Sequence, residues 1–361
     1  MDKFSPKHYV FLLLATGIVS MKTYPIVFIQ PAGRDSWVAV IGASILIFLA
    51  FLFMIKTLKS RPNTTLLNVY QTAVGKTFGT ILIGIFMLVM LLTMVESACI
   101  EADSMHQNMM VETPSWYFLL FFTIPALYVI RKDTVAVIII TIIGIVLIMI
   151  AGIHLGILTT QQKNIMFLFP VFEKGLTGGF FTSMFKALGA YGFIGITLPY
   201  LSSVTEKRES LSKYTIIGLL IIIQMQIVSI TGIFMTFSPA DAESYYYPKL
   251  LQTHLVSYFE MLEFGELYVM LQILGGWLLK YVVTFHALIE ILKSFDVKKH
   301  IIYILTFIIT GVVTILSFLA TYTSIRLFNL LYYFPWISLA NFVVIPLIIF
   351  SIYRIKIKSA A

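Results

Sequence analysis

Charged side chains are scarce in this sequence. Asp, Glu, Lys and Arg together make up 12% of its 361 residues, whereas hydrophobic residues make up 59%. The mean hydropathy is +0.94. Because about one quarter of the residues in a soluble domain are charged, this chain has roughly half the charge that a water-facing surface requires. The composition excludes a soluble fold and indicates a membrane protein.

Cysteine is also nearly absent. Cys99 is the single one in the sequence, so no internal disulfide and no cysteine-based metal cluster is expected. The sequence contains no glycine-rich phosphate loop, no Gly-x-Ser-x-Gly elbow and no HExxH motif. His286 and Glu290 share a helical face, and this pair is interpreted either as a polar contact between helices or as a proton relay. We therefore expect no enzyme, no cofactor and no metal.

Long apolar segments dominate the chain. A membrane-spanning helix needs about 20 mainly apolar residues, and ten segments approach this pattern. The first is longer than the apolar part of a signal peptide and lacks a small-residue cleavage site. We therefore predict an all-α polytopic membrane protein that forms one transmembrane domain over residues 1–361. The predicted spans cover residues 8–30, 37–55, 78–103, 116–130, 135–158, 178–203, 214–237, 266–292, 301–322 and 333–353.

Basic residues are distributed unequally between the connecting segments. With the N-terminus placed in the cytosol, inner segments hold 17 of the 25 Lys and Arg residues and outer segments hold five. This bias predicts cytosolic N- and C-termini, and it explains the net charge of +8 without nucleic-acid binding. Residues 62–75 are predicted to form an inner surface helix. Residues 238–265 form an outer loop, interpreted as a solvated connector or as a lid.

A few ionisable residues fall inside the predicted spans. Each costs roughly 2.5–3.5 kcal/mol to insert, so it needs a compensating environment. Lys280 lies in the middle of the eighth span and is expected to face a cavity or an acidic partner. Lys22, Glu96 and Lys186 lie nearer the outer ends of their helices. Two interpretations remain open for these four residues: ion pairs between helices, or the lining of a ligand or ion pathway.

Small residues interrupt two of the spans. Gly17 and Ser20 interrupt the first, and residues 189–195 of the sixth contain three glycines. Such glycines permit close helix packing, or they mark a discontinuous helix whose freed amides and carbonyls hold a ligand. The first and sixth spans correspond in two five-span halves, about 8–158 and 178–353. Paired breaks favour a LeuT-like five-plus-five inverted repeat in which half-helix N-termini offer amides to a carboxylate.

A candidate ligand site follows from these two groups of residues. It lies where the breaks meet the charges inside the membrane. The predicted ligand-binding residues are Gly17, Ser20, Lys22, Glu96, Tyr191, Gly192, Phe193, Lys280 and Thr284.

Several short motifs have a familiar order and spacing. They are Gly33-Arg34-Asp35-Ser36-Trp37, Pro62 to Gly79 with Leu66 and Gly75-Lys76, Glu112-Thr113-Pro114, Pro170 to Gly175, Leu198-Pro199 and Tyr246-Tyr247-Pro248. On these residues the chain resembles, nearly end to end, the B subunits of spore germinant receptors. These are endospore germination permeases of the amino acid–polyamine–organocation transporter superfamily.

The resemblance implies a nutrient-sensing subunit in the inner membrane of a dormant spore. It implies A and C partner subunits and a small germinant, such as an amino acid, bound between spans one, three, six and eight. The sequence departs from the family pattern in three places. The Gly-x-Gly of span one is reduced to Gly17 and Ser20, Phe193 stands where an acid is common, and Glu263 lies where an arginine is common. Lys280 is interpreted as a compensating cation, and a secondary amino-acid or cation-coupled transporter is the alternative function.

Overall fold

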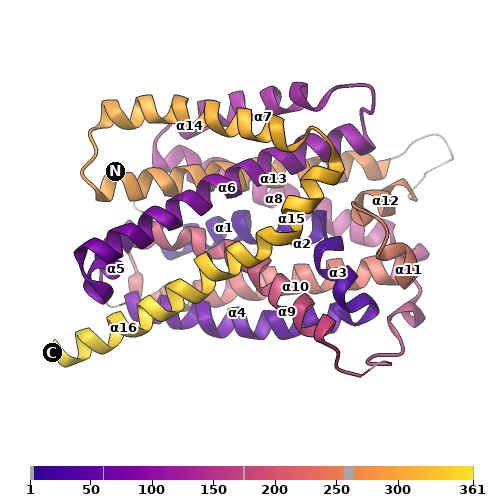
Figure 1. Cartoon of the computed structure of the whole chain (residues 1–361), viewed down its shortest axis with the longest axis horizontal. Coiled ribbons are helices and arrows are strands. Elements are labelled where there is room, and N and C mark those ends of the chain that lie inside the picture. The colour runs from indigo at the N-terminus through magenta and orange to yellow at the C-terminus, as the bar shows by residue number, and fades with distance from the viewer. Residues whose placement is uncertain (1–3, 60, 174, 256–263, 361) are drawn as a thin grey trace.

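The computed structural model describes residues 4–59, 61–173, 175–255 and 264–360. The chain is 84% helical and has no strand in these ranges. The long helices run side by side, and both chain ends lie at the same end of the bundle (Figure 1). We call this the terminus end. The opposite end, where α11 (Pro239–Ala242) and α12 (Pro248–His254) lie, is the α12 end.

Eight helical stretches are long and apolar enough to cross a membrane among the residues that the structure describes. They are Ile26–Leu58, Lys76–Asn108, Thr134–Leu158, Gly178–Ser202, Arg208–Thr236, Met270–Ser294, Lys299–Ala320 and Ser324–Ser359. Two of the ten predicted spans are not among these eight, because neither forms a single helix of at least 18 residues. The first is divided into short pieces, and the fourth, α7 (Ser115–Ile130), has only 16 residues.

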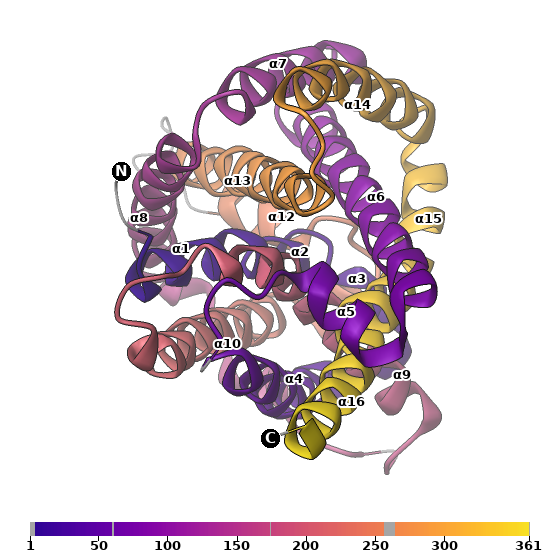
Figure 2. The same cartoon turned by 90° about the vertical axis from the view of Figure 1, so that its left-hand side faces the viewer.

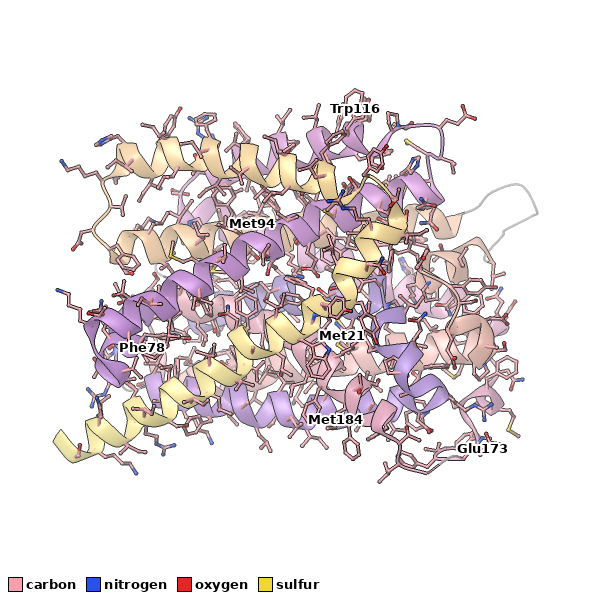
Figure 3. All side chains as sticks on the ribbon, viewed as in Figure 1. Met21, Phe78, Met94, Trp116, Glu173 and Met184 are labelled. Atoms are coloured by element: carbon pink, nitrogen blue, oxygen red, sulfur yellow. The ribbon has the colours of Figure 1, made fainter. Side chains whose placement is uncertain are left out.

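Burial separates central helices from peripheral ones. Within an 18-residue apolar stretch, 83% of the residues are buried in α13 (Phe264–Ser294), compared with 22% in α14 (Lys299–Ala320). Viewed from the terminus end, α7 and α14 lie at the edge of the bundle (Figure 2). Large apolar side chains such as Phe78 and Trp116 remain exposed on this perimeter (Figure 3). Such a surface suits lipid, where every backbone polar group must be bonded within the protein.

The first predicted span is broken twice. It consists of α1 (Pro6–Gly17), the single turn α2 (Ser20–Thr23) and α3 (Ile26–Ala32). At the first break, the carbonyls of Gly17 and Ile18 accept hydrogen bonds from the Gln226 amide, both at 2.8 Å. At the second break, Tyr24 leaves the helical region with φ −125° and ψ 60°. Pro25 follows and has no N–H to donate, which favours the interruption.

The sixth span changes its helix type where a discontinuity was predicted. The α-helix α9 (Gly178–Tyr191) continues directly as the 3₁₀ helix η4 (Gly192–Ser202), so the chain stays helical. An 11-residue 3₁₀ helix is unusually long. The span's glycines permit a close approach to the last span, because a Cβ on Gly189 would lie 1.9 Å from the Pro335 carbonyl oxygen. Close helix packing, one of the two interpretations of these glycines, is therefore present.

The last span is longer than predicted. It contains α15 (Ser324–Ser338), the π-helix η6 (Leu339–Val344) and α16 (Ile345–Ala360), against a prediction of 333–353. The other spans follow the hydropathy more closely. They are α4 (Ser36–Leu58), preceded by the 3₁₀ turn η1 (Gly33–Asp35), α6 (Lys76–Asn108), α8 (Thr134–Leu158) and α10 (Leu211–Thr236).

Short helices lie in the described parts of the two predicted segments outside the spans. In the 62–75 segment, α5 (Leu66–Val74) begins where the Thr65 hydroxyl accepts a hydrogen bond from the Asn68 amide at 3.1 Å, and it stops before Gly75, whose φ is +92°. A helix is therefore present within the segment for which an inner surface helix was predicted. The 238–265 loop contains α11 and α12. Glu263, a predicted departure from the family pattern, lies outside the described residues.

Candidate functional site

A buried ion pair joins three spans at the first helix break. Lys280 of α13 is fully buried, and its ammonium donates to a carboxylate oxygen of Glu96 at 2.6 Å. Glu96 belongs to α6 and is also buried. The same ammonium donates to the Ser20 hydroxyl at 2.7 Å, and Ser20 is the first residue of α2. The predicted acidic partner of Lys280 is therefore Glu96.

The other end of α2 is bonded to the same pair. The Tyr24 hydroxyl donates a short hydrogen bond to the second oxygen of Glu96. The Tyr24 ring also stacks on Trp277, with the ring centroids 6.0 Å apart. The carboxylate thus accepts from both the ammonium and a phenol. Because both ends of α2 are bonded to this pair, the position of α2 depends on it.

An aromatic side chain covers the ammonium. The Nζ atom of Lys280 lies 3.4 Å from the centroid of the Phe193 ring, in η4. A cation over an aromatic face is attracted by the ring quadrupole, more strongly when both are desolvated. Of the predicted site residues, Ser20, Glu96, Phe193 and Lys280 therefore meet at one point, contributed by spans one, three, six and eight.

Other predicted residues bond elsewhere. The Tyr191 hydroxyl bonds to the Ser44 hydroxyl at 2.7 Å. A Cβ on Gly192 would lie 2.9 Å from a Val343 methyl group, so this glycine packs against the last span. The Thr284 hydroxyl donates to the backbone carbonyl of its own helix one turn earlier, at 2.6 Å.

The remaining predicted residues make contacts outside the cluster. A Cβ on Gly17 would lie 2.9 Å from Ile222, which makes it a packing residue beside the break. Lys22 donates to Gln272 at 3.3 Å. Lys186 donates to the Val27 carbonyl at 3.3 Å. Neither lysine forms an ion pair with a described residue, so the interpretation as ion pairs between helices holds for Glu96 and Lys280 alone.

The sequence prediction missed three residues of the cluster. Tyr24 and Trp277 support the ion pair, and Gln226 satisfies the carbonyls at the first break. A signal existed for two of them. Pro25 marks a second break beside Tyr24, and Gln226 carries a polar amide in a mainly apolar span.

The second candidate pair, His286 and Glu290, forms part of a polar contact between helices. The histidine lies within 3.2 Å of the Tyr200 hydroxyl and 3.3 Å of the Thr134 hydroxyl, and 3.9 Å from Glu290. Thr134 and Tyr200 belong to α8 and η4. Among the described residues, no group of three His, Cys, Asp or Glu side chains is arranged to hold a metal.

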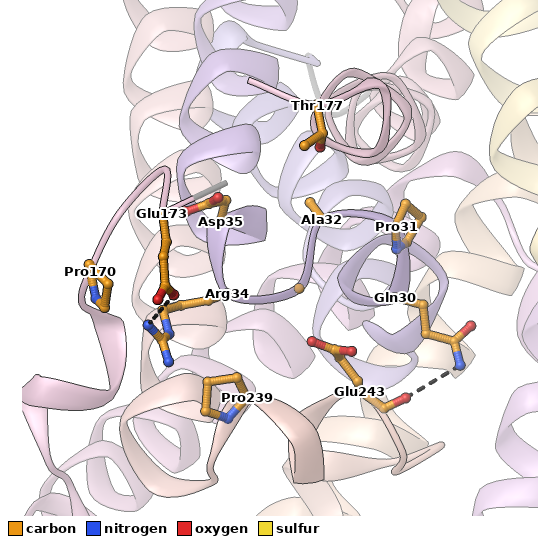
Figure 4. A pocket seen from close by; sticks show the side chains of 11 residues that line it. Gln30, Pro31, Ala32, Arg34, Asp35, Pro170, Glu173, Thr177, Pro239 and Glu243 are labelled. Atoms are coloured by element: carbon orange, nitrogen blue, oxygen red, sulfur yellow. Dashed lines mark hydrogen bonds and ion pairs between the residues drawn. The ribbon is translucent and has the colours of Figure 1, made fainter. Parts of the chain in front are cut away.

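A surface hollow of about 400 Å³ lies at the α12 end (Figure 4). The Gly33-Arg34-Asp35 turn forms one wall and bonds to its surroundings. Arg34 lies 3.6 Å from the Glu173 carboxylate, and Asp35 accepts from the Phe172 amide at 2.9 Å. Gly33 adopts φ +55°, and a Cβ there would lie 2.8 Å from Glu243. The motif therefore anchors the turn to the loop that contains Phe172 and Glu173, and Gly33 leaves room for Glu243.

Comparison with protein families identifies the chain. The sequence pattern of the family described as spore germination protein matches residues 3–326. The chain belongs to the spore germination protein family. This confirms the resemblance to spore germination proteins. Comparison with curated protein sequences gives no match.

Solved structures show the fold of this family member. The chain is similar to MhsT in complex with L-phenylalanine, with a TM-score of 0.62 and 12% identity over 97% of this chain and 89% of that one. It is similar to a Na⁺-coupled sialic acid symporter in a substrate-bound outward-open state, with a TM-score of 0.66 and 13% identity over 94% and 78%. It is also similar to a mutant manganese transporter of Eremococcus coleocola, with a TM-score of 0.62 and 12% identity over 95% of this chain and 78% of that one. The predicted LeuT-like fold is confirmed.

Proposed function

We propose that this chain is the nutrient-sensing subunit of a spore germinant receptor and that it binds an amino acid at the Lys280–Glu96 pair. It acts as a binding protein rather than an enzyme, in the spore inner membrane with both termini in the cytosol. The observation that carries the proposal is the bonding of this buried pair to both ends of α2.

The chemistry of the pair matches that of an amino acid. Without ligand, the ammonium and the carboxylate satisfy each other, which a buried ion pair requires. An amino acid carries one group of each sign. Its carboxylate would pair with Lys280 and its ammonium with Glu96, so that no buried charge is left alone. Charged and bidentate hydrogen bonds of this kind are the strong ones in proteins.

Ligand exchange at the pair also provides a signal. The amino acid would replace the bonds that Ser20 and Tyr24 make to the pair, and α2 would then be free to adopt a second position. A ligand shifts such an equilibrium only by binding one state more tightly than the other. Movement of α2 would alter the surface that the chain presents to its A and C partner subunits, and this would start germination.

Substitution of Lys280 tests the site. We expect Lys280→Met to abolish amino-acid binding, because the ligand carboxylate would lose its partner while Glu96 would be left buried alone. Lys186→Met is the matched control, since Lys186 is equally buried but has no carboxylate partner among the described residues. The assay is titration of the purified chain in lipid nanodiscs with single amino acids.

A second variant keeps the test decisive if Lys280→Met is poorly produced. Lys280→Met with Glu96→Gln removes both charges, so that no unpaired ion remains in the interior. Amino-acid binding by this stable double variant at the affinity of the unchanged chain would overturn the site. Spores that lack the gene, tested against a panel of single nutrients, would identify the germinant.

A secondary amino-acid or cation-coupled transporter is the alternative. The likeness to transporter structures over 94% to 97% of the chain favours it. Uptake of a labelled amino acid into proteoliposomes that contain only this chain separates the two functions. Accumulation of the amino acid inside the vesicles would support transport, whereas binding without flux would support a receptor.

A further inference from the structure

A second pocket of about 340 Å³ lies near the α12 end, away from the Lys280–Glu96 pair. Viewed end-on, α8 and α10 lie on either side of α1 (Figure 2). Residues of both α8 and α10 line the pocket. Lys22 of α2, Lys163 of the loop after α8 and Lys249 of α12 all line it. We call it the tri-lysine pocket.

The three ammonium groups have only neutral partners. Lys22 donates to the Gln272 amide oxygen at 3.3 Å, and Lys249 donates to the Gln252 amide oxygen at 2.7 Å. Lys163 donates to a backbone carbonyl at 3.2 Å. No carboxylate among the described residues forms an ion pair with any of them. The pocket therefore concentrates positive charge that the described part of the chain leaves uncompensated.

The three lysines lie close enough to repel one another. Burial, together with the neighbouring charges of Lys22 and Lys163, lowers the pKa of Lys249 to about 7. Burial also lowers the pKa of Lys163. An anion between the three groups would relieve both effects.

Two buried donors in the same pocket have no partner. The Gln272 Nε2 atom and the Ser229 hydroxyl make no hydrogen bond with a described residue, and the two residues are only 5% and 8% exposed. A buried polar group without a partner is costly. Both residues line the pocket, so two amide protons and a hydroxyl proton are available to an acceptor there. Donors combined with ammonium groups match an oxyanion.

The remaining walls are apolar and reach the perimeter of the bundle. Met149, Ile153, Met225 and Val228 contribute them. Ile153 is 62% exposed and Val228 is 53% exposed, on α8 and α10 respectively. In a bilayer this side of the pocket faces acyl chains. A molecule that fills it therefore needs an anionic head and an apolar part.

We propose that the tri-lysine pocket binds the oxyanion head of an amphiphile that enters sideways from the membrane. An anionic phospholipid supplies this chemistry, and a soluble oxyanion supplies the head alone. The site is separate from the one proposed for the amino acid. Because Lys22 and Ser20 both belong to α2, an anion at Lys22 and an amino acid at Lys280 act on the same turn of helix.

Lipid binding to the purified full-length chain tests the proposal. In a neutral detergent, native mass spectrometry compares phosphatidylglycerol with phosphatidylcholine of identical acyl chains. We expect phosphatidylglycerol to bind about tenfold more tightly or better, as charge-assisted hydrogen bonds to the head require. Lys163→Gln with Lys249→Gln should remove most of this preference. Both substitutions lie outside the amino-acid site.

A matched control removes the same charge elsewhere. Lys356→Gln with Lys358→Gln alters two exposed residues of α16, at the opposite end of the bundle, and should retain the preference. Equal loss in both double variants, or no preference in the unchanged chain, would overturn the proposal. Stabilisation by inorganic phosphate that depends on Lys163 and Lys249, without any effect of phosphatidylglycerol, would overturn entry from the membrane. If the double variant is not produced, Lys163→Gln alone serves the same comparison.

Discussion

Exchanging Glu96 for Gln removes one charge from the pair at the first helix break and leaves the shape of the side chain unchanged. The ammonium of Lys280 is then fully buried without a counter-ion, since both side chains are at most 2% exposed. Removing one partner of a buried ion pair costs about 3–5 kcal/mol. The folding equilibrium would shift by at least about 100-fold. Lys280→Met is expected to cost a similar amount, because it leaves the carboxylate alone.

The double variant, Glu96→Gln with Lys280→Met, separates the interaction between the two charges from the effect of losing each side chain. With both charges removed, most of the summed loss should be recovered, which gives an interaction energy of about 3 kcal/mol or more in a double-mutant cycle. The measurement is unfolding of the purified chain in mixed micelles, followed by circular dichroism. Additive losses, with the double variant as unstable as the sum of the single ones, would refute the reasoning that the pair holds α2 in place.

Three further predictions concern other parts of the chain. Gly189→Ala should cost about 2–5 kcal/mol and lower the yield of folded protein, because its Cβ would lie 1.9 Å from the Pro335 carbonyl oxygen. Anion affinity at the tri-lysine pocket should fall several-fold as pH rises through 7. The reason is that Lys249, whose pKa is lowered to about 7, loses its charge in this range. Among the described residues, the charged groups that face Lys249 are Lys22 and Lys163. Cysteines at Tyr245→Cys and Lys207→Cys should be labelled from outside and from inside the membrane, respectively.

Each of these predictions has a control. Gly156→Ala should be tolerated, because a Cβ there meets nothing within 4 Å, and equal yields for both alanine variants would refute the packing argument. Constant anion affinity from pH 5.5 to 8.5 would exclude Lys249 from the site. The native Cys99 is buried, so it gives little background in the labelling experiment. Labelling of position 207 from outside would reverse the proposed orientation.

Hydropathy and local chemistry were sufficient to predict the fold. Ten apolar segments and a break after Gly17 follow from the residues alone, because lipid demands long apolar helices and small residues mark where a helix is interrupted. The change from α-helix to 3₁₀ helix at Gly192 was not predictable. It depends on the close approach of the last span, and sequence distance does not reveal which helices are neighbours.

The candidate site was predictable in part for the same reason. A lysine in the middle of a span needs a compensating environment, so either a cavity or an acidic partner was expected near Lys280, and Glu96 was one of few candidates for that partner. The tri-lysine pocket could not be predicted as a unit. Lys22, Lys163 and Lys249 come from three separate segments, and two of them lie in loops where a lysine is unremarkable.

The four residues of α2 make up about one helical turn. An isolated turn has almost no stability of its own, because a helix gains stability only as it lengthens. Its direction in the bilayer is therefore decided by what its neighbours offer: the carboxylate of the third span, the ammonium of the eighth, and the amides of Gln226 and Gln272 beside it. A rearrangement of only a few bonds can tilt such a segment. The proposed amino acid and the proposed lipid would then both change the orientation of this one helical turn.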